Sequence, residues 1–173
     1  NPSQSRIYNI STKNQQILAK GEGHKQLVDN LEDLQRIKWK SFDNREITGV
    51  LVAPKTRVPN AKMPVLIDIH GGPANQYQPF YNGFRSFPTV NVPMVTIFPN
   101  IRGSSGFGKE FQNLDNQEKR EDAIKDIEAL LDWIKTQPHL DSEKIVVKGV
   151  SYGGFVGLAI GLRNSNRVKA VIA

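Results

Sequence analysis

One serine in this sequence is flanked by glycines at the spacing that suits a serine nucleophile. Residues 149–153 read Gly-Val-Ser-Tyr-Gly, a G-x-S-x-G pattern with Ser151 at its centre. A predicted strand at residues 144–148 precedes it, and a predicted apolar helix follows it to about Arg163. A sharp strand-to-helix turn strains the serine backbone, and flanking glycines let the helix approach the strand closely. We predict that Ser151 is a nucleophile; a tight turn with an incidental serine is the alternative.

Acyl transfer by a serine also needs hydrogen-bond donors aimed at the developing oxyanion. One expected donor is the backbone N–H of Tyr152, and another comes from the His-Gly-Gly-Pro loop at residues 70–73. Gly71 and Gly72 would place no side chain between the backbone and the reacting carbonyl. The alternative for this loop is an ordinary β-turn.

The remaining members of a catalytic triad are not apparent in the sequence. Enzymes with this serine turn place an acid and then a histidine after the serine, yet no Asp, Glu or His follows Ser151. His24, His70 and His139 all precede it, and we predict that His139 lies at the surface. Without a general base the serine is a weak nucleophile. We therefore expect these residues to be a fragment, nearly inert alone, whose triad is completed by further chain or by another copy.

Strands and helices alternate along most of the chain. The predicted elements are hairpins at residues 7–10 with 16–19 and 34–39 with 47–52, strands at 65–69, 94–98, 144–148 and 168–173, and helices at 118–137 and after Ser151. In the first helix, Ile124, Ile127, Leu130, Leu131 and Ile134 fall at core-facing spacing. This order predicts an α/β fold, with a mostly parallel sheet and helices on both faces.

The charged residues outside the serine turn are predicted to be structural. Arg102, in the glycine-rich segment at residues 100–108, is expected to hold that loop rather than bind substrate. Asp122, Asp126 and Asp132 lie on or beside the predicted helix, where we expect solvated or capping groups.

Composition excludes several classes of protein. The net charge is +6, but Lys and Arg are scattered among acids and no nucleic-acid recognition module accompanies them. The absence of cysteine excludes disulfides and thiolate metal sites, and no cofactor is expected. The longest apolar run, residues 155–162, is too short to span a membrane. The glycines also do not follow the dinucleotide pattern. We expect a soluble protein, with a cytoplasmic location favoured over a periplasmic or secreted one.

Three motifs in this order resemble those of the prolyl oligopeptidase family, which includes acylaminoacyl peptidases and dipeptidyl peptidases. They are residues 68–73, 100–108 and 149–155. The resemblance implies an α/β-hydrolase domain accompanied by a β-propeller. On this basis, residues 1–23 would end a β-propeller-like domain, residues 24–33 would be a linker, and residues 34–173 would be the N-terminal part of the catalytic domain, truncated after the last predicted strand.

The same resemblance implies peptide substrates and an acyl-enzyme on Ser151, with the Tyr152 N–H and the Gly71–Gly72 turn around the oxyanion. Some relatives use a tyrosine side chain at the position that His70 occupies, so this sequence departs from that subgroup. Two alternatives stay open: a carboxylesterase or lipase with the same serine turn, and a non-catalytic interaction module. The sequence does not indicate which peptide bond would be cut.

Overall fold

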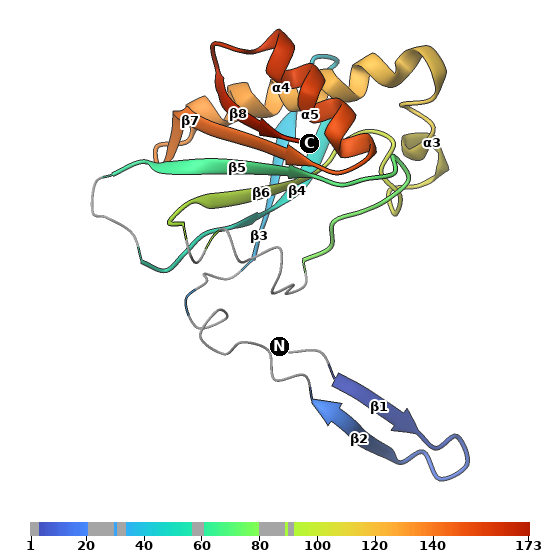
Figure 1. Ribbon diagram of the computed structural model, residues 1–173. Coiled ribbons are helices and arrows are strands. Elements are labelled where there is room, and N and C mark those ends of the chain that lie inside the picture. The colour runs from blue at the N-terminus through green and yellow to red at the C-terminus, as the bar shows by residue number, and fades with distance from the viewer. Residues whose placement is uncertain (1–3, 21–29, 31–33, 57–60, 80–88, 90–91) are drawn as a thin grey trace.

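Six strands form one mixed sheet in the computed structural model, which describes residues 4–20, 30, 34–56, 61–79, 89 and 92–173 (Figure 1). The strands are β3 (Gln35–Lys40), β4 (Glu46–Val52), β5 (Met63–Ile69), β6 (Val95–Asn100), β7 (Leu140–Gly149) and β8 (Val168–Ile172), in the order β3-β4-β6-β5-β7-β8. β5 runs parallel to β6 and β7, and β7 runs parallel to β8. β4 is antiparallel to β3 and β6. The predicted α/β fold with a mostly parallel sheet is confirmed.

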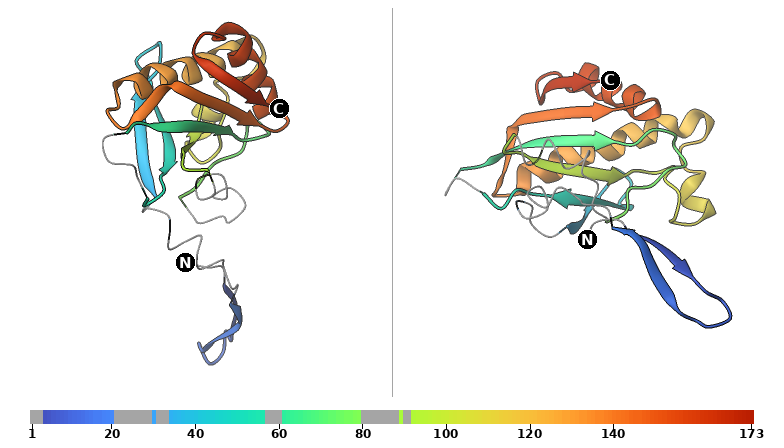
Figure 2. Two further views of the ribbon diagram at one scale, coloured as in Figure 1. Left: turned by 60° about the vertical axis from the view of Figure 1, so that its left-hand side comes forward. Right: turned by 60° about the horizontal axis from the view of Figure 1, so that its bottom comes forward.

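Two long helices, α4 (Arg120–Thr136) and α5 (Tyr152–Arg163), cover the same face of this sheet (Figures 1 and 2). The predicted apolar stripe of α4 is buried in the main core, which also contains residues of β5, β6, β7 and α5. The shorter elements α3 (Lys109–Gln112) and η1 (Gln117–Lys119) precede α4. The opposite face carries a small apolar cluster of Val50, Val52, Tyr77 and Phe98. Neither of the two long helices lies on that face, so the predicted helices there stay a prediction.

A separate two-stranded antiparallel sheet comprises β1 (Gln4–Tyr8) and β2 (Gln15–Lys20). Its turn is closed by Asn9 Oδ1, which accepts from the backbone N–H groups of Ser11 and Thr12 at 3.0 and 2.9 Å. The predicted hairpin is confirmed, although β1 begins earlier than expected. His24 and most of the expected linker lie outside the described residues. Within the described part of the chain, no helix is long and apolar enough to cross a membrane.

The carboxyl ends of three parallel strands bring the three sequence motifs to one edge of the sheet. Ile69 of β5 is in register with Gly149 of β7, and Ile67 of β5 is in register with Ile97 of β6. The segments after Ile69, Asn100 and Gly149 therefore begin side by side.

Two glycines let α5 start immediately after β7. A Cβ atom at Gly149 would overlap the backbone of Gly153, and one at Gly153 would overlap the backbone carbonyl of Ile69 on β5. Side chains at either position would force α5 away from the sheet. In contrast, a Cβ at Gly157, one turn further along α5, would meet Val147 at an ordinary contact distance of 3.4 Å.

A buried ion pair joins the loop after β6 to α4. Arg102 donates from Nε to Asp126 at 3.0 and 3.1 Å and from Nη2 at 2.8 Å, and its backbone N–H donates to Asp126 Oδ2 at 2.9 Å. Asp126 has 0% exposure and Arg102 has 3%. The prediction that Arg102 holds its own loop is confirmed. The prediction that Asp126 is a solvated or capping group is wrong, because this carboxylate is the buried counter-charge of Arg102.

The same carboxylate also holds the β3–β4 hairpin. Ser41 Oγ donates to Asp126 Oδ1 at 2.6 Å, and Trp39 Nε1 donates to the Asp126 backbone carbonyl at 2.9 Å. Arg102 in turn donates to both carboxylate oxygens of Asp43 in the hairpin turn, at 3.2 and 3.3 Å. Hairpin, loop and helix thus share one buried polar cluster.

Pairing within this cluster shifts three pKa values. Burial acts to lower the pKa of Arg102, but hydrogen bonds and charges of Asp126 and Asp43 outweigh it, so this pKa is raised. Burial raises the pKa of Asp126, against the opposing effect of Arg102 and Ser41. The pKa of Asp43 is lowered, because hydrogen bonds from Arg102 and Arg45 outweigh its burial. Arg102 therefore stays charged and needs its counter-charges.

We expect Asp126→Ala to destabilise the fold by about 3–5 kcal/mol, because it leaves the Arg102 charge buried without its main partner. The control is Asp132→Ala, which removes an ion pair to Arg167 at 2.7 Å from a side chain that is 75% exposed. That loss should cost at most about 1 kcal/mol. Urea unfolding of both variants measures the difference, and equal losses would contradict the buried-pair argument.

We expect Gly153→Ala to lower the melting temperature sharply and Gly157→Ala to leave it unchanged or slightly higher. Both glycines are buried in α5, but only the first has backbone atoms where a Cβ would stand. At the second position, alanine gains up to about 1 kcal/mol of helix propensity. Thermal unfolding followed by circular dichroism measures both. Similar melting temperatures for the two variants would show that the β7–α5 turn tolerates a side chain.

Candidate functional site

Ser151 occupies the turn between β7 and α5 with an exposed side chain. Its backbone angles are φ 56° and ψ −121°, a region that a non-glycine residue adopts only under strain. Within the described residues it is one of four non-glycine positions with positive φ. The structure therefore gives this serine the strained, solvent-facing turn that the G-x-S-x-G pattern predicts.

The His-Gly-Gly-Pro loop after β5 lies directly against this turn. A Cβ at Gly71 would stand 2.8 Å from the Val150 carbonyl oxygen and 3.4 Å from Ser151 Cβ. Gly72 has φ +57°, with nothing within 4 Å of where its Cβ would be, so open space faces this turn. The structure brings Gly71 next to Ser151, as a loop that supplies main-chain donors requires.

Tyr152 is the first residue of α5, so its backbone N–H has no acceptor within the helix. Its side chain is buried in the main core. Burial, followed by the negative charge of Asp115, raises the pKa of the Tyr152 phenol, which therefore keeps its proton at neutral pH. The ring thus anchors this residue in the core, while its backbone N–H lies at the start of the helix.

His70 fixes the start of this loop to the loop after β6. His70 Nε2 lies 3.0 Å from Ser104 Oγ, and Ser104 Oγ donates to the Ile101 carbonyl at 2.6 Å. Because the single hydroxyl proton of Ser104 is used in that bond, Nε2 of His70 is the donor between the two side chains. Both side chains are buried. His70 therefore positions the loop, and its imidazole is not directed at a reacting group.

Further hydrogen bonds join the same two loops. Tyr77 N–H donates to Asn100 Oδ1 at 2.7 Å, and Asn100 Nδ2 donates to the Tyr77 carbonyl at 2.9 Å. The Ser105 N–H donates to the Asn75 carbonyl at 2.9 Å. The glycine-rich segment at residues 100–108 thus supports the loop beside Ser151, and this role agrees with the structural interpretation of its sequence.

A second ion pair crosses from β5 to β7 just before the serine turn. Lys148 Nζ donates to Asp68 Oδ2 at 2.9 Å, and Tyr77 Oη donates to Asp68 Oδ1 at 2.8 Å. Sequence reasoning missed this cluster and the partner of His70. The sequence contains one signal for this cluster. Asp68 is a carboxylate inside an otherwise apolar strand, and a buried carboxylate needs hydrogen-bond donors.

No described histidine stands beside Ser151 as a base. His70 is engaged with Ser104, and His139 is exposed at the opposite end of β7, as predicted. Among the described residues, no group of three or more His, Cys, Asp or Glu side chains is arranged to hold a metal ion. Among the described residues, the structure therefore brings Gly71 and the Tyr152 N–H next to Ser151, without a histidine beside them.

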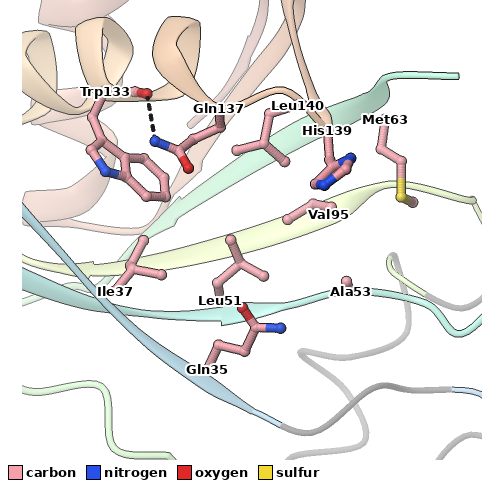
Figure 3. A pocket seen from close by; sticks show the side chains of 10 residues that line it. All are labelled: Gln35, Ile37, Leu51, Ala53, Met63, Val95, Trp133, Gln137, His139 and Leu140. Carbon is pink, nitrogen blue, oxygen red and sulfur yellow. Dashed lines mark hydrogen bonds between the residues drawn. The ribbon is translucent and has the colours of Figure 1, made fainter. Parts of the chain in front are cut away.

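An apolar cavity of about 200 Å³ lies at the other end of the strands (Figure 3). It is lined by the first residues of three strands, Met63 of β5, Val95 of β6 and Leu140 of β7. Trp133 of α4 and Gln137, the residue that follows this helix, close one side, where Gln137 Nε2 donates to the Trp133 carbonyl at 3.4 Å. Because Ser151 follows the carboxyl end of β7, this cavity is not part of its site.

Comparison with known proteins matches most of the chain to peptidases. It is 31% identical over 140 residues to the uncharacterized peptidase YuxL of Bacillus subtilis, covering 80% of this chain and 21% of the relative. Dipeptidyl-peptidase 5 of Porphyromonas gingivalis is 27% identical, with 96% of this chain and 25% of the relative covered. The chain thus spans about a fifth to a quarter of the length of these curated relatives.

Solved structures agree on the fold. A post-proline cleaving enzyme from Rickettsia typhi superposes with a TM-score of 0.82 at 24% identity, covering 98% of this chain and 24% of that enzyme. Pyrococcus horikoshii acylaminoacyl peptidase gives a TM-score of 0.79 at 23% identity, covering 100% of this chain and 27% of that enzyme. At this level of identity, the likeness concerns the fold.

The sequence profile of the Prolyl oligopeptidase family matches residues 84–173, which is just over half of the chain and includes Ser151. This match agrees with the resemblance found in the three sequence motifs, and the serine turn and the sheet of the structure agree with it as well. The chain belongs to the prolyl oligopeptidase family of serine peptidases, and its sheet and helices form part of an α/β-hydrolase domain.

Proposed function

We propose that the complete polypeptide is a serine peptidase that cleaves oligopeptides through an acyl-enzyme on Ser151. The observation that carries this proposal is the positive φ of an exposed Ser151 at a turn packed against Gly71. That geometry holds a hydroxyl above the sheet edge beside main-chain N–H groups. Family membership supports peptides as the substrate class.

The residues present would supply the nucleophile and the oxyanion donors of the reaction. Ser151 Oγ attacks the scissile carbonyl carbon and its proton passes to a histidine base. The Tyr152 N–H and main-chain N–H groups of the Gly71–Gly72 turn bind the tetrahedral oxyanion. The base returns its proton to the leaving amine as the C–N bond breaks, and water then hydrolyses the Ser151 ester.

We propose that the histidine base and its acidic partner come from outside these residues, from further chain or from another copy. None of His24, His70 and His139 follows the serine, and the two that are described do not stand beside it. The limited coverage of the curated relatives supports further chain as the source.

The domain assignment is part of the same proposal. Residues 34–173 would be the N-terminal part of the catalytic domain, residues 24–33 a linker, and residues 1–23 the end of a β-propeller-like domain. The separate β1–β2 hairpin supports this division, since Ile7, Tyr8 and Leu18 are exposed and an isolated hairpin is only marginally stable.

We expect a fluorophosphonate to add once to the complete polypeptide, at Ser151, as the serine oxygen displaces fluoride from phosphorus. Ser151→Ala should abolish the adduct and lower peptide hydrolysis by at least about 10⁴-fold. Ser142→Ala, a serine at the opposite end of β7, is the matched control and should label normally. Intact mass and a peptide assay measure these results.

Three outcomes separate the competing functions. Labelling that survives Ser151→Ala would disprove the nucleophile assignment. Hydrolysis of short acyl esters without any peptide cleavage would favour a carboxylesterase. A complete polypeptide with no adduct and no hydrolysis would favour a non-catalytic interaction module.

A further inference from the structure

The peptide between Gly71 and Gly72 is the part of the loop beside Ser151 that changes direction most easily. Glycine adopts positive and negative φ about equally, so a peptide flanked by two glycines flips at little cost. This peptide is trans, so its C=O and N–H point in opposite directions. A flip would put the Gly71 carbonyl oxygen where the Gly72 N–H now points. An oxyanion site would then present an acceptor where it needs a donor.

A side chain of the same loop donates to the carbonyl of this peptide. Asn75 Nδ2 donates to the Gly71 carbonyl oxygen at 3.3 Å. His70 Nδ1 lies 3.4 Å from the same oxygen, but Nε2 of this ring is the donor to Ser104. In the neutral imidazole Nδ1 therefore has no proton to donate. Among the described side chains, the neutral donor to this carbonyl is thus Asn75.

Asn75 is itself fixed in place, so it does not follow a flip of the peptide. Its Oδ1 accepts from the Gln76 N–H at 2.8 Å, which leaves the NH2 end of the amide facing Gly71. Its backbone carbonyl accepts from the Ser105 N–H at 2.9 Å. A Cβ at Gly106 would overlap the side chain of Gln76, so the glycine-rich segment leaves room for this loop. The anchor of Asn75 is therefore the loop after β6.

We propose that Asn75 is a positioning residue for the oxyanion site: its side-chain NH2 holds the Gly71 carbonyl and so keeps the Gly72 N–H directed toward the space beside Ser151. This inference rests on the proposed serine peptidase function. Gly71 is close enough for this role, since its Cβ would stand 3.4 Å from Ser151 Cβ. The next residue, Pro73, has no N–H, so Gly72 is the last main-chain donor of the turn. Asn75 acts through this peptide rather than on the substrate.

The proposal predicts an effect on the rate of chemistry rather than on substrate binding. Asn75→Leu removes the donor at similar size, and Asn75→Asp keeps an acceptor for the Gln76 N–H but has no proton to donate. Each variant should lower kcat about ten- to hundredfold with KM within about twofold of wild type, because a misdirected oxyanion donor weakens the transition state.

Gln78→Leu is the matched control. This exposed amide lies in the same loop, but it donates to Gln76 Oε1 at 3.0 Å rather than to the Gly71 carbonyl. Its loss should leave kcat and KM at the wild-type values. A Gln78→Leu variant as slow as Asn75→Leu would overturn the proposal, because any change in the loop would then have the same effect.

The test uses the complete polypeptide and counts active sites with a fluorophosphonate, so that kcat is expressed per labelled Ser151. A peptide aldehyde adds to Ser151 as a hemiacetal whose oxygen occupies the oxyanion position, whereas the matching peptide alcohol forms no adduct. In both Asn75 variants the aldehyde should bind more weakly by the factor that kcat loses, and the alcohol should bind as in wild type. A purely structural role would lower the melting temperature or the number of active sites without changing the ratio of these two affinities.

The outcomes separate this inference from the function on which it rests. A wild-type polypeptide without a Ser151 adduct overturns the serine peptidase proposal and the inference together. A labelled wild type whose Asn75→Leu variant keeps its kcat per active site overturns the inference alone. Wild-type activity in Asn75→Asp beside a slow Asn75→Leu would assign the effect to the bond with Gln76, and a raised KM at unchanged kcat would assign it to substrate binding. Either result also overturns the inference.

Discussion

The close approach of α5 to β5 and β7 is the constraint on which the rest of the site depends. It exists because Gly149 and Gly153 have no Cβ atoms, which would overlap neighbouring backbone. With only two residues between strand and helix, Ser151 is forced to positive φ and its side chain faces outward. The strain of that residue is offset by the burial of the helix that follows, since Val156 and Ile160 of α5 have no exposed surface.

Side-chain hydrogen bonds, rather than strand pairing, hold the loops around that turn. His70 is bonded to Ser104, Asn100 is bonded to the backbone of Tyr77, and Asp68 joins Tyr77 to Lys148. Each bond connects a residue near the end of one strand to a different strand or loop. Because these donors and acceptors are buried, breaking one leaves its partner unsatisfied, so the loops move little relative to one another.

The parts that sequence reasoning predicted correctly are those with local causes. The strained backbone of Ser151, the buried stripe of α4 and the contact between Gly149 and Gly153 follow from residue types within a few positions of one another. The prediction for Asp126 is wrong because its partner Arg102 is 24 positions away, and the helix pattern alone favours a solvated acid. Its position four residues before Leu130, on the core-facing stripe, was the available signal.

The start of α5 differs from an ordinary helix start in a way that suits oxyanion binding. A serine at the position before a helix usually caps the first N–H groups, but Ser151 has neither the extended backbone nor the side-chain bond that capping needs. The first turn of α5 also contains no acidic residue to compensate the helix dipole. Within the described part of the chain, the serine hydroxyl and the Tyr152 N–H therefore remain uncommitted, whereas the Gly153 N–H donates to the Val150 carbonyl at 3.0 Å. A side-chain cap would have stabilised the helix by about 1 kcal/mol. The helix lacks this stabilisation at the end where negative charge would develop in acyl transfer.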